Sequence, residues 1–228
     1  MKNQIIEKIR NGLIVSCQAH KDWPMYGSNI MAAFARAAYD GGAVGIRASG
    51  CEDIKAIMNV VDLPIIGIQK HWSTEFEAFI TPSWDDAKEI LKLGVDIIEL
   101  DAGDRTRPNG ETFSSIVEKI RKEFPDVLIM GEVGDFAEAE RIKPDECDLI
   151  STTLSGYTST TKNIDKVDIE LIRMIHRSIS IPVIAEGHVS HPTDAKAALE
   201  AGALAVVVGT AITRPEIITK IFVQQLNV

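Results

Sequence analysis

Eight short apolar runs, each followed by a segment with helical spacing, extend along the chain and constrain its fold more than any other feature. Parallel βαβ units produce this alternation, because a crossover helix must return the chain to the start of the next strand. We therefore expect strands at Leu13–Gln18, Val44–Arg47, Ile65–Lys70, Ile97–Asp101, Leu128–Glu132, Leu149–Thr153, Val183–Glu186 and Ala205–Gly209. A further run at Ala78–Ile80 is expected to be an extended piece of a loop.

A weak internal repeat supports eight units. Gly42, Gly94 and Gly202 each stand between a helical segment and an apolar run, and the second gap is about twice the first. If the first gap holds two units, each has about 27 residues, and eight fill most of the 228-residue chain. The pattern predicts a TIM (β/α)8 barrel, with residues 1–228 as a single domain. An open doubly wound sheet is the alternative, but no GxGxxG follows the first run.

Three helix starts carry capping signals of their own. Ser83, Asp135 and Thr213 are each followed three residues later by an acidic residue, which is the spacing of an N-terminal capping arrangement. We expect helices to begin after each of them.

The charge and cysteine content exclude several classes of protein. With 24 basic and 33 acidic residues, the formal net charge is −9, which disfavours nucleic-acid and anionic-membrane partners. Cys17, Cys51 and Cys147 form no CxxC pair, so neither a disulfide framework nor a zinc site is indicated, and a reducing cytoplasm fits best. No segment approaches the roughly 18 apolar residues of a membrane span. We expect a cytoplasmic protein that is neither exported nor inserted in a membrane.

Polar residues end several of the expected strands. A TIM barrel carries its reaction site at the C-terminal ends of its strands, and alternate strands contribute side chains to one layer. The polar residues at the ends of odd-numbered strands are Gln18, Lys70, Glu132 and Glu186, and those at the ends of even-numbered strands include Arg47 and Asp101. A lysine and two glutamates in a partly desolvated mouth would shift one another's pKa values and separate acid from base roles. Solvated rim charges and salt bridges are the alternative interpretation.

The last two loops suggest a phosphate site. Glycine lets backbone N–H groups approach an anion closely, and Gly187 and Gly209 follow the seventh and eighth strands. Thr210, Arg214 and the start of the next helix would add donors. Tight turns alone could also explain the two glycines.

His188 and His191 have HxxH spacing, but no carboxylate is clearly placed to complete a metal site. We therefore expect no bound metal.

Seven sequence blocks, in order, resemble those of the bacterial N-acylglucosamine-6-phosphate 2-epimerases. The blocks are GLIVSCQA (12–19), GGAVGIRA (41–48), LPIIGIQK (63–70), FITPS (79–83), TTLSGYT (152–158), IPVIAEG (181–187) and VVVGTAITRP (206–215). The resemblance implies an eight-stranded barrel that interconverts N-acetylmannosamine 6-phosphate and N-acetylglucosamine 6-phosphate in sialic acid catabolism. It also implies that no organic cofactor is needed and that the protein is a homodimer.

The resemblance also assigns roles to individual residues. It places the catalytic lysine at Lys70 and the catalytic glutamate at Glu186. It places Gln18 and Arg47 around the sugar, and Gly187, Gly209 and Arg214 around the phosphate. We also expect Glu132 and Thr152 to bind substrate and Thr210 to join the phosphate site. The chain departs from the family pattern at Glu132, His188 and Thr210, where the family commonly has Asp, Arg and Gly. The first change affects a supporting carboxylate, and the other two affect the phosphate pocket.

Epimerisation at C2 of the open-chain sugar requires removal of a proton beside the aldehyde and its return on the other face. A neutral Lys70 and a protonated Glu186 suit these two tasks. A class I aldolase or lyase is a competing hypothesis, because a barrel lysine can also form a Schiff base with a carbonyl substrate. A phosphosugar sensor without turnover is the non-enzymatic alternative.

Overall fold

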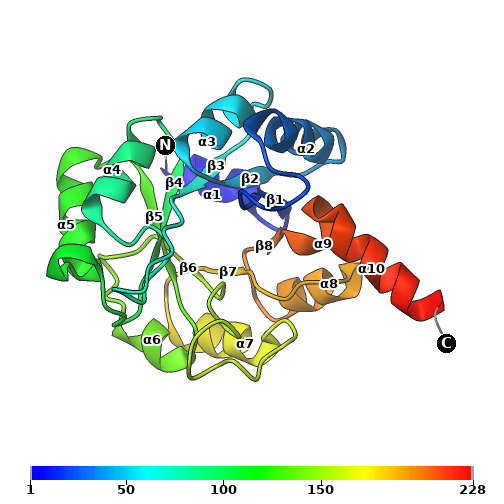
Figure 1. Ribbon diagram of the computed structural model, residues 1–228. Helices are drawn as coiled ribbons and strands as arrows, with labels where there is room; N and C mark the ends of the chain where they lie inside the picture. The colour runs from blue at the N-terminus through cyan, green and yellow to red at the C-terminus, as the bar shows by residue number, and fades with distance from the viewer. Residues whose placement is uncertain (1, 227–228) are drawn as a thin grey trace.

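In the computed structural model, which describes residues 2–226, eight parallel strands close into a barrel in chain order (Figure 1). The strands are β1 (Leu13–Cys17), β2 (Gly45–Ser49), β3 (Ile65–Ile68), β4 (Ile97–Asp101), β5 (Leu128–Glu132), β6 (Leu149–Ser151), β7 (Val183–Ala185) and β8 (Ala205–Val208). The last strand pairs with the first, Val206 lying opposite Leu13. The predicted TIM (β/α)8 barrel is therefore confirmed, and the open sheet is excluded.

The end of β2 differs from the prediction. Ala48 and Ser49 continue its ladder with β3, opposite Gly67 and Ile68. Arg47 therefore lies within the strand, and the prediction that it ends the strand is wrong. An arginine resembles a strand terminus in the sequence because burying an unpaired charge is costly, and the sequence does not show the partners that compensate this cost. β4 and β5 have the predicted bounds, and the other five strands end one or two residues early.

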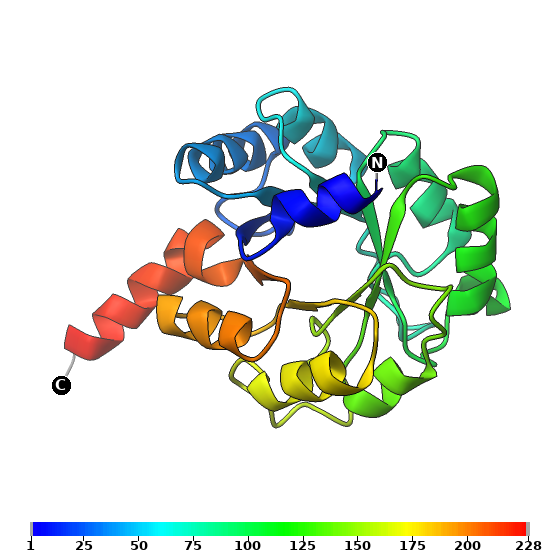
Figure 2. The same ribbon diagram turned by 180° about the vertical axis from the view of Figure 1, so that it is seen from behind.

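The barrel interior changes from apolar at the N-terminal ends of the strands to charged at the C-terminal ends. The apolar cluster contains Ile14, Ile66, Ile97, Leu128, Met130, Leu149, Ile184, Ala205 and Val207. Helix α1 (Lys2–Ile9) crosses the N-terminal end of the barrel and adds Ile5 and Ile9 to this cluster (Figure 2). Because α1 covers that end, the mouth lies at the C-terminal ends of the strands.

The crossover segments supply an outer ring of helices around the strands (Figure 1). These are α2 (Ser28–Asp40), α3 (Cys51–Met58), α4 (Trp84–Leu91), α5 (Phe113–Glu123), α6 (Phe136–Arg141), α7 (Ile169–Ser178) and α8 (Pro192–Glu200), with a 3-10 turn η1 (Pro108–Gly110) before α5. Their apolar faces pack against the outer sides of the strands, which explains why the strands read as nearly continuous apolar runs.

Two of the three capping predictions are confirmed. The Ser83 side chain accepts a hydrogen bond from the backbone N–H of Asp86, and Asp135 accepts one from that of Glu138. A helix also begins shortly after Thr213, at Pro215, but Thr213 does not cap it, because this residue ends the short helix α9 (Thr210–Thr213). Its hydroxyl instead donates to the backbone carbonyl of Ser16, 3.0 Å away, and so ties the loop after β8 to β1.

The last helix, α10 (Pro215–Leu226), departs from the ring and projects away from the barrel (Figures 1 and 2). None of its residues is buried. Across residues 2–226, no helix is both long and apolar enough to cross a membrane.

Candidate active site at the barrel mouth

Arg47 lies at the centre of the charged half of the barrel interior and contacts three glutamates. Its Nε donates to Glu99, and its Nη2 donates to Glu132 Oε1 at 2.5 Å. Glu186 Oε2 lies 3.2 Å from the same Nε, whose N–H is directed at Glu99. One guanidinium therefore faces three carboxyl groups, which cannot all be ionised there at low energetic cost.

Glu99 is a member of this cluster that the sequence analysis missed. It lies in the middle of β4, is fully buried, and also accepts a hydrogen bond from Thr153 at 3.3 Å. The available signal was an acidic residue inside an otherwise apolar strand. Asp101, which was expected to add charge at the same rim, instead pairs with Arg105 at 2.6 Å in the loop after β4.

Burial and the crowding of carboxyl groups raise the pKa values of two glutamates. Burial is the main cause of the rise in the pKa of Glu186 to about 7, and Glu99 adds to the rise while Arg47 and Lys70 oppose it. The pKa of Glu132 is raised well above its ordinary value, again first by burial and then by Glu99. Glu186 can therefore hold a proton near neutral pH and donate it, and the pKa of Glu132 is shifted in the same direction.

Lys70 lies just beyond β3, on the opposite side of the barrel from β7 and Glu186. Its backbone pairs antiparallel with Ile80, which confirms that Ala78–Ile80 is a short extended part of the loop. The pKa of Lys70 is lowered to about 8, first by burial and then by the positive charge of Arg47, against the opposing effect of the glutamates. A substantial fraction of the amine is therefore neutral and able to accept a proton at slightly alkaline pH.

Several buried oxygens at the mouth have no hydrogen-bond partner among the described residues. They are Gln18 Oε1, Glu132 Oε2 and Glu186 Oε2. The Gln18 amide is held in place from its other side, because its Nε2 donates to Ser16 Oγ at 2.6 Å. Buried polar groups are normally paired, so these oxygens are suited to a polar ligand that enters the mouth.

Thr152 and Gly187 hold the backbone on either side of the Glu186 carboxylate. The Thr152 hydroxyl donates to the backbone carbonyl of Glu186 at 2.9 Å and accepts from its N–H at 3.1 Å. Gly187 has φ +98°, a conformation that side chains rarely allow. The Thr152 hydroxyl is thus engaged with Glu186, whereas this residue was expected to bind the substrate.

The predicted phosphate residues lie in the loops after β7 and β8. Gly209 passes close to Ser16, where a Cβ would lie 3.3 Å from the serine Cβ, and Thr210 begins α9. Arg214 follows α9, and its guanidinium lies 3.5 Å from the centre of the Trp23 ring. Its Nε donates to Glu216 at 2.7 Å, so the cation is held by partners on two sides.

His188 follows Gly187 and has φ +54°, unusual for a residue other than glycine. Its ring stacks on Tyr157, with ring centres 4.7 Å apart, and its Nε2 is buried without a partner among the described residues. His191 is exposed and instead caps α8, its ring nitrogen accepting from Thr193. Within residues 2–226, no group of three or more His, Cys, Asp or Glu side chains is arranged to hold a metal ion.

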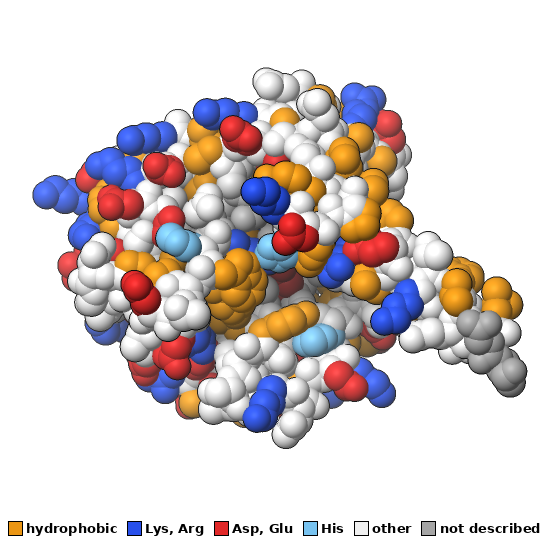
Figure 3. All heavy atoms as spheres, viewed as in Figure 1, with side chains coloured by type: hydrophobic (Ala, Val, Ile, Leu, Met, Phe, Trp, Pro, Cys, Tyr) orange, Lys and Arg blue, Asp and Glu red, His pale blue; other side chains and the backbone are white. Residues whose placement is uncertain are grey.

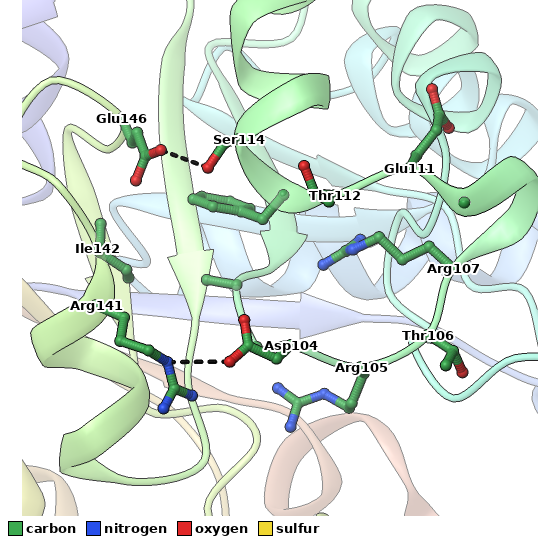
Figure 4. Close-up of a pocket in the computed structure, with 14 residues that line it drawn as sticks. Asp104, Arg105, Thr106, Arg107, Glu111, Thr112, Ser114, Arg141, Ile142 and Glu146 are labelled. Carbon is green, nitrogen blue, oxygen red and sulfur yellow. Dashed lines mark hydrogen bonds and ion pairs between the residues drawn. The ribbon is translucent and has the colours of Figure 1, made fainter.

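A pocket of about 330 Å³ lies outside the mouth, between the loop after β4 and α6 (Figure 4). Ion pairs bind its walls together. Arg105 bridges Asp101 and Glu138, with an Nη1 to Glu138 Oε1 distance of 2.7 Å, and Arg141 pairs with Asp104 at 3.3 Å. Because acidic side chains pair with Arg105 and Arg141, we infer that these ion pairs fix the loop after β4 to α6.

The fold and the mouth together define a TIM-barrel enzyme with a lysine and a glutamate of shifted pKa just beyond the ends of two opposite strands. Comparisons with known proteins are specific. Residues 31–228 match the NanE family, described as "Putative N-acetylmannosamine-6-phosphate epimerase". Relatives named "Putative N-acetylmannosamine-6-phosphate 2-epimerase" occur in Caldanaerobacter subterraneus and Listeria monocytogenes. The Caldanaerobacter relative is 44% identical over 98% of this chain and 94% of its own length. The Listeria relative is 44% identical over 100% of this chain and 99% of its own length.

Solved structures agree with this assignment. The N-acetylmannosamine-6-phosphate 2-epimerase from Clostridium perfringens has a similar structure, with a TM-score of 0.92 and 42% identity over 96% of this chain and 95% of that one. A geranylgeranylglyceryl phosphate synthase from Thermoplasma acidophilum, at 18% identity and a TM-score of 0.60, shares only the fold. The chain belongs to the NanE family of N-acetylmannosamine-6-phosphate epimerases.

Proposed function

We propose that this chain interconverts N-acetylmannosamine 6-phosphate and N-acetylglucosamine 6-phosphate, as an isomerase of amino sugar and sialic acid catabolism. Its family membership and the relatives described above support the proposal. The single observation that carries it furthest is the placement of Lys70 and Glu186, with pKa values of about 8 and about 7, on opposite sides of one barrel mouth. A base on one side and an acid on the other can invert a carbon without hydride transfer.

In the proposed reaction, the neutral Lys70 amine removes the proton from C2 of the open-chain sugar, and the negative charge develops on the aldehyde oxygen. Protonated Glu186 returns a proton to the other face of C2, and the two residues exchange roles in the reverse direction. The pKa of Glu132 is raised well above its ordinary value, and the residue has an unpaired buried oxygen, so its protonated form can donate to the developing oxyanion.

The remaining predicted residues bind or position groups around this centre. Arg47 orients the three glutamates, and Thr152 fixes the backbone of Glu186. The Gln18 amide offers its unpaired oxygen to the sugar. The phosphate lies against the Gly187 and Gly209 backbones, with Thr210 and Arg214 as further donors.

Proton NMR in deuterium oxide tests the proposed reaction. With N-acetylmannosamine 6-phosphate, we expect the second epimer to appear with deuterium at C2 and none at C3. Retention of the original hydrogen at C2 in the product would contradict solvent-exchanging acid and base groups. A Schiff-base aldolase would use the same neutral amine, so borohydride with substrate provides the second arm: covalent labelling of Lys70 would favour an aldolase or lyase.

We further propose that the protein is a cytoplasmic homodimer. The free thiols of Cys17, Cys51 and Cys147 suit a reducing compartment.

The dimer is supported by α10, whose apolar side chains at Ile221, Phe222, Val223 and Leu226 are between 47% and 82% exposed. Such a patch on a projecting helix is typical of a surface that another chain covers. A second copy presents the same apolar helix, so the contact can be reciprocal about a two-fold axis.

A further inference from the structure

One side of the barrel mouth carries an aromatic wall, which we define as His20, Trp23, Trp72 and Phe79. Its rings come from two loops, residues 18–27 after β1 and residues 69–83 after β3. His20 meets Trp23 edge to face, with ring centres 4.4 Å apart, and lies 5.9 Å from the Trp72 ring. Trp72 in turn stacks on Phe79 at 4.3 Å, with an angle of 11° between the ring planes. The four rings therefore lie next to one another in an unbroken row, from Trp23 through His20 and Trp72 to Phe79.

The wall adjoins the proposed catalytic residues. His20 lies two residues beyond Gln18, and Trp72 lies two residues beyond Lys70. Phe79 is tied to the same loop, because its carbonyl accepts a hydrogen bond from the N–H of His71 at 2.9 Å. Figure 3 shows hydrophobic side chains and histidines gathered beside the hollow at the centre of this face.

His20 also lies within the electrostatic influence of both ends of the proposed substrate site. Burial lowers its pKa, and the charges of Lys70 and Arg214 lower the pKa further. The imidazole is therefore mostly neutral at pH 7 and offers one donor and one acceptor. The sugar carbons between the reacting carbon and the phosphate carry hydroxyl groups, which need such partners when they leave water.

The wall has a free aromatic face and also holds a cation. Phe79 covers one face of the Trp72 indole, yet the residue remains 59% exposed. Trp23 carries the Arg214 guanidinium on its ring at 3.5 Å, while Glu216 holds the Nε of the same group. Trp23 thus fixes the plane of Arg214 and leaves its Nη groups outside the pair with Glu216.

We propose that this aromatic wall is part of the substrate site and sets its specificity. In this proposal, which rests on the proposed function, Trp72 and His20 contact the carbon chain of the acylamino sugar phosphate between C2 and the phosphate. Trp23 is a positioning residue that orients Arg214 toward the phosphate. The C–H faces of the sugar pack on the exposed indole, and the neutral imidazole binds hydroxyl groups.

Collisional quenching of tryptophan fluorescence tests the contact without relying on turnover. The chain has three tryptophans, and Trp84 lies on α4 beside Phe124, outside the wall. One variant keeps only Trp72 (Trp23→Phe, Trp84→Phe) and its matched control keeps only Trp84 (Trp23→Phe, Trp72→Phe). The probe is the 6-phosphate of 2-acetamido-2-deoxyglucitol, an open-chain sugar alcohol that has no aldehyde and cannot enolise.

We expect saturating alditol phosphate to lower the acrylamide quenching constant of Trp72 by about two-fold or more and to leave that of Trp84 unchanged. Inhibition of turnover by the same alditol phosphate in the same Trp72-only variant shows that the site is occupied. Inhibition without protection of Trp72 would overturn the aromatic wall as a substrate contact and leave the proposed function standing. Absence of epimerase activity in the unsubstituted protein would instead defeat the proposed function.

Kinetics provide the second readout. Trp72→Ala should raise KM for N-acetylmannosamine 6-phosphate roughly tenfold, the effect of losing one aromatic contact, with kcat within about three-fold of the parent value. Trp84→Ala is the control and should leave KM unchanged. Trp23→Leu should raise KM for the phosphorylated sugar while retaining kcat, as expected for misplacement of Arg214. An unchanged KM in the folded Trp72→Ala variant would contradict the proposal.

Discussion

Lys70 and Glu186 show how burial beside the Arg47 and glutamate cluster can prepare both a base and an acid. Burial is the main cause of the lowered pKa of Lys70, and Arg47 adds to it; burial is also the main cause of the raised pKa of Glu186, and Glu99 adds to it. The two values are thereby brought within about one unit of each other near neutrality. Such tuning suits reversible proton exchange, in which each group must serve as acid in one direction and base in the other.

Replacement of Lys70 should abolish most turnover without unfolding the barrel. Lys70→Ala is expected to lower kcat by about 10²-fold or more, the usual scale for loss of a positioned acid or base. Steady-state kinetics measures the loss, and circular dichroism checks the fold. Lys92→Ala, on the exposed end of α4, is the matched control and should retain parent activity. Near-normal turnover of Lys70→Ala would remove this residue from the mechanism.

The pH dependence of kcat/KM should be bell-shaped. The reaction needs neutral Lys70, whose fraction rises through a pKa of about 8, and protonated Glu186, whose fraction falls through a pKa of about 7. The product of the two fractions is largest near pH 7.5 and falls on both sides. In Glu186→Gln, the residual activity should be low and should rise to a plateau at alkaline pH, since only the lysine still titrates. A remaining alkaline decline would assign that limb to another group.

At the scale of single elements, every predicted strand is present, and the bounds of β4 and β5 are correct. The runs that end in Gln18, Lys70 and Glu186 leave the ladder one or two residues earlier than predicted, because a polar residue that follows a strand looks like part of it in the sequence. The sequence could not show that Arg47 lies inside β2 or that Glu99 is its partner, because the pair joins residues 52 positions apart. Asp101 stands two positions beyond Glu99 on the same strand, so local spacing could not decide between them. The sequence alone did not show that the Arg47 charge is paired with glutamates far away along the chain.

The aromatic wall was missed for a related reason. His20, Trp23 and Trp72 stand in loops without periodicity, and their proximity depends on how β1 and β3 are placed in the barrel. By contrast, Gly187 and Gly209 could be singled out from the sequence, since glycine after a strand is a local signal. Of these two, Gly187 has the positive φ that requires glycine, and this leads to a prediction about the loop after β7.

Gly187→Ala should affect stability and function together. At φ +98° an alanine is strained, and we expect the free energy of unfolding to fall by about 1–2 kcal/mol. The shifted backbone should also raise KM for the phosphorylated sugar. Gly94→Ala is a matched control, because Gly94 has φ +81°, has nothing within 4 Å of its added Cβ, and lies before β4 at the opposite end of the barrel. Chemical denaturation and kinetics should show similar destabilisation in both variants but a raised KM only in Gly187→Ala.

At the scale of the whole molecule, α10 is the element that the barrel does not accommodate. Helices after the earlier strands cover the barrel wall, whereas α10, which follows β8 and the short α9, projects away from the barrel (Figure 1). Several of its apolar side chains are exposed. The loop that begins this departure also carries Arg214, which stands immediately before α10. Packing of α10 against a second chain would therefore bury the apolar residues and restrain one end of the proposed phosphate site.

Charge placed on α10 should convert the proposed dimer into a monomer. In Phe222→Glu with Leu226→Glu, two side chains that are 70% and 82% exposed become acidic, and pairing them with a second acidic helix costs both apolar burial and charge repulsion. Light scattering coupled to size-exclusion chromatography should give twice the 25.0 kDa chain mass for the parent and the single chain mass for the variant. Tyr39→Glu, an exposed aromatic residue on α2, is the control and should remain dimeric.

The monomer should keep its circular dichroism spectrum, because no residue of α10 is buried against the barrel. Its KM should nevertheless rise, since Arg214 loses the restraint of the packed helix. A parent protein with the single chain mass at micromolar concentration would contradict the dimer, and a double variant that stays dimeric would place the interface elsewhere.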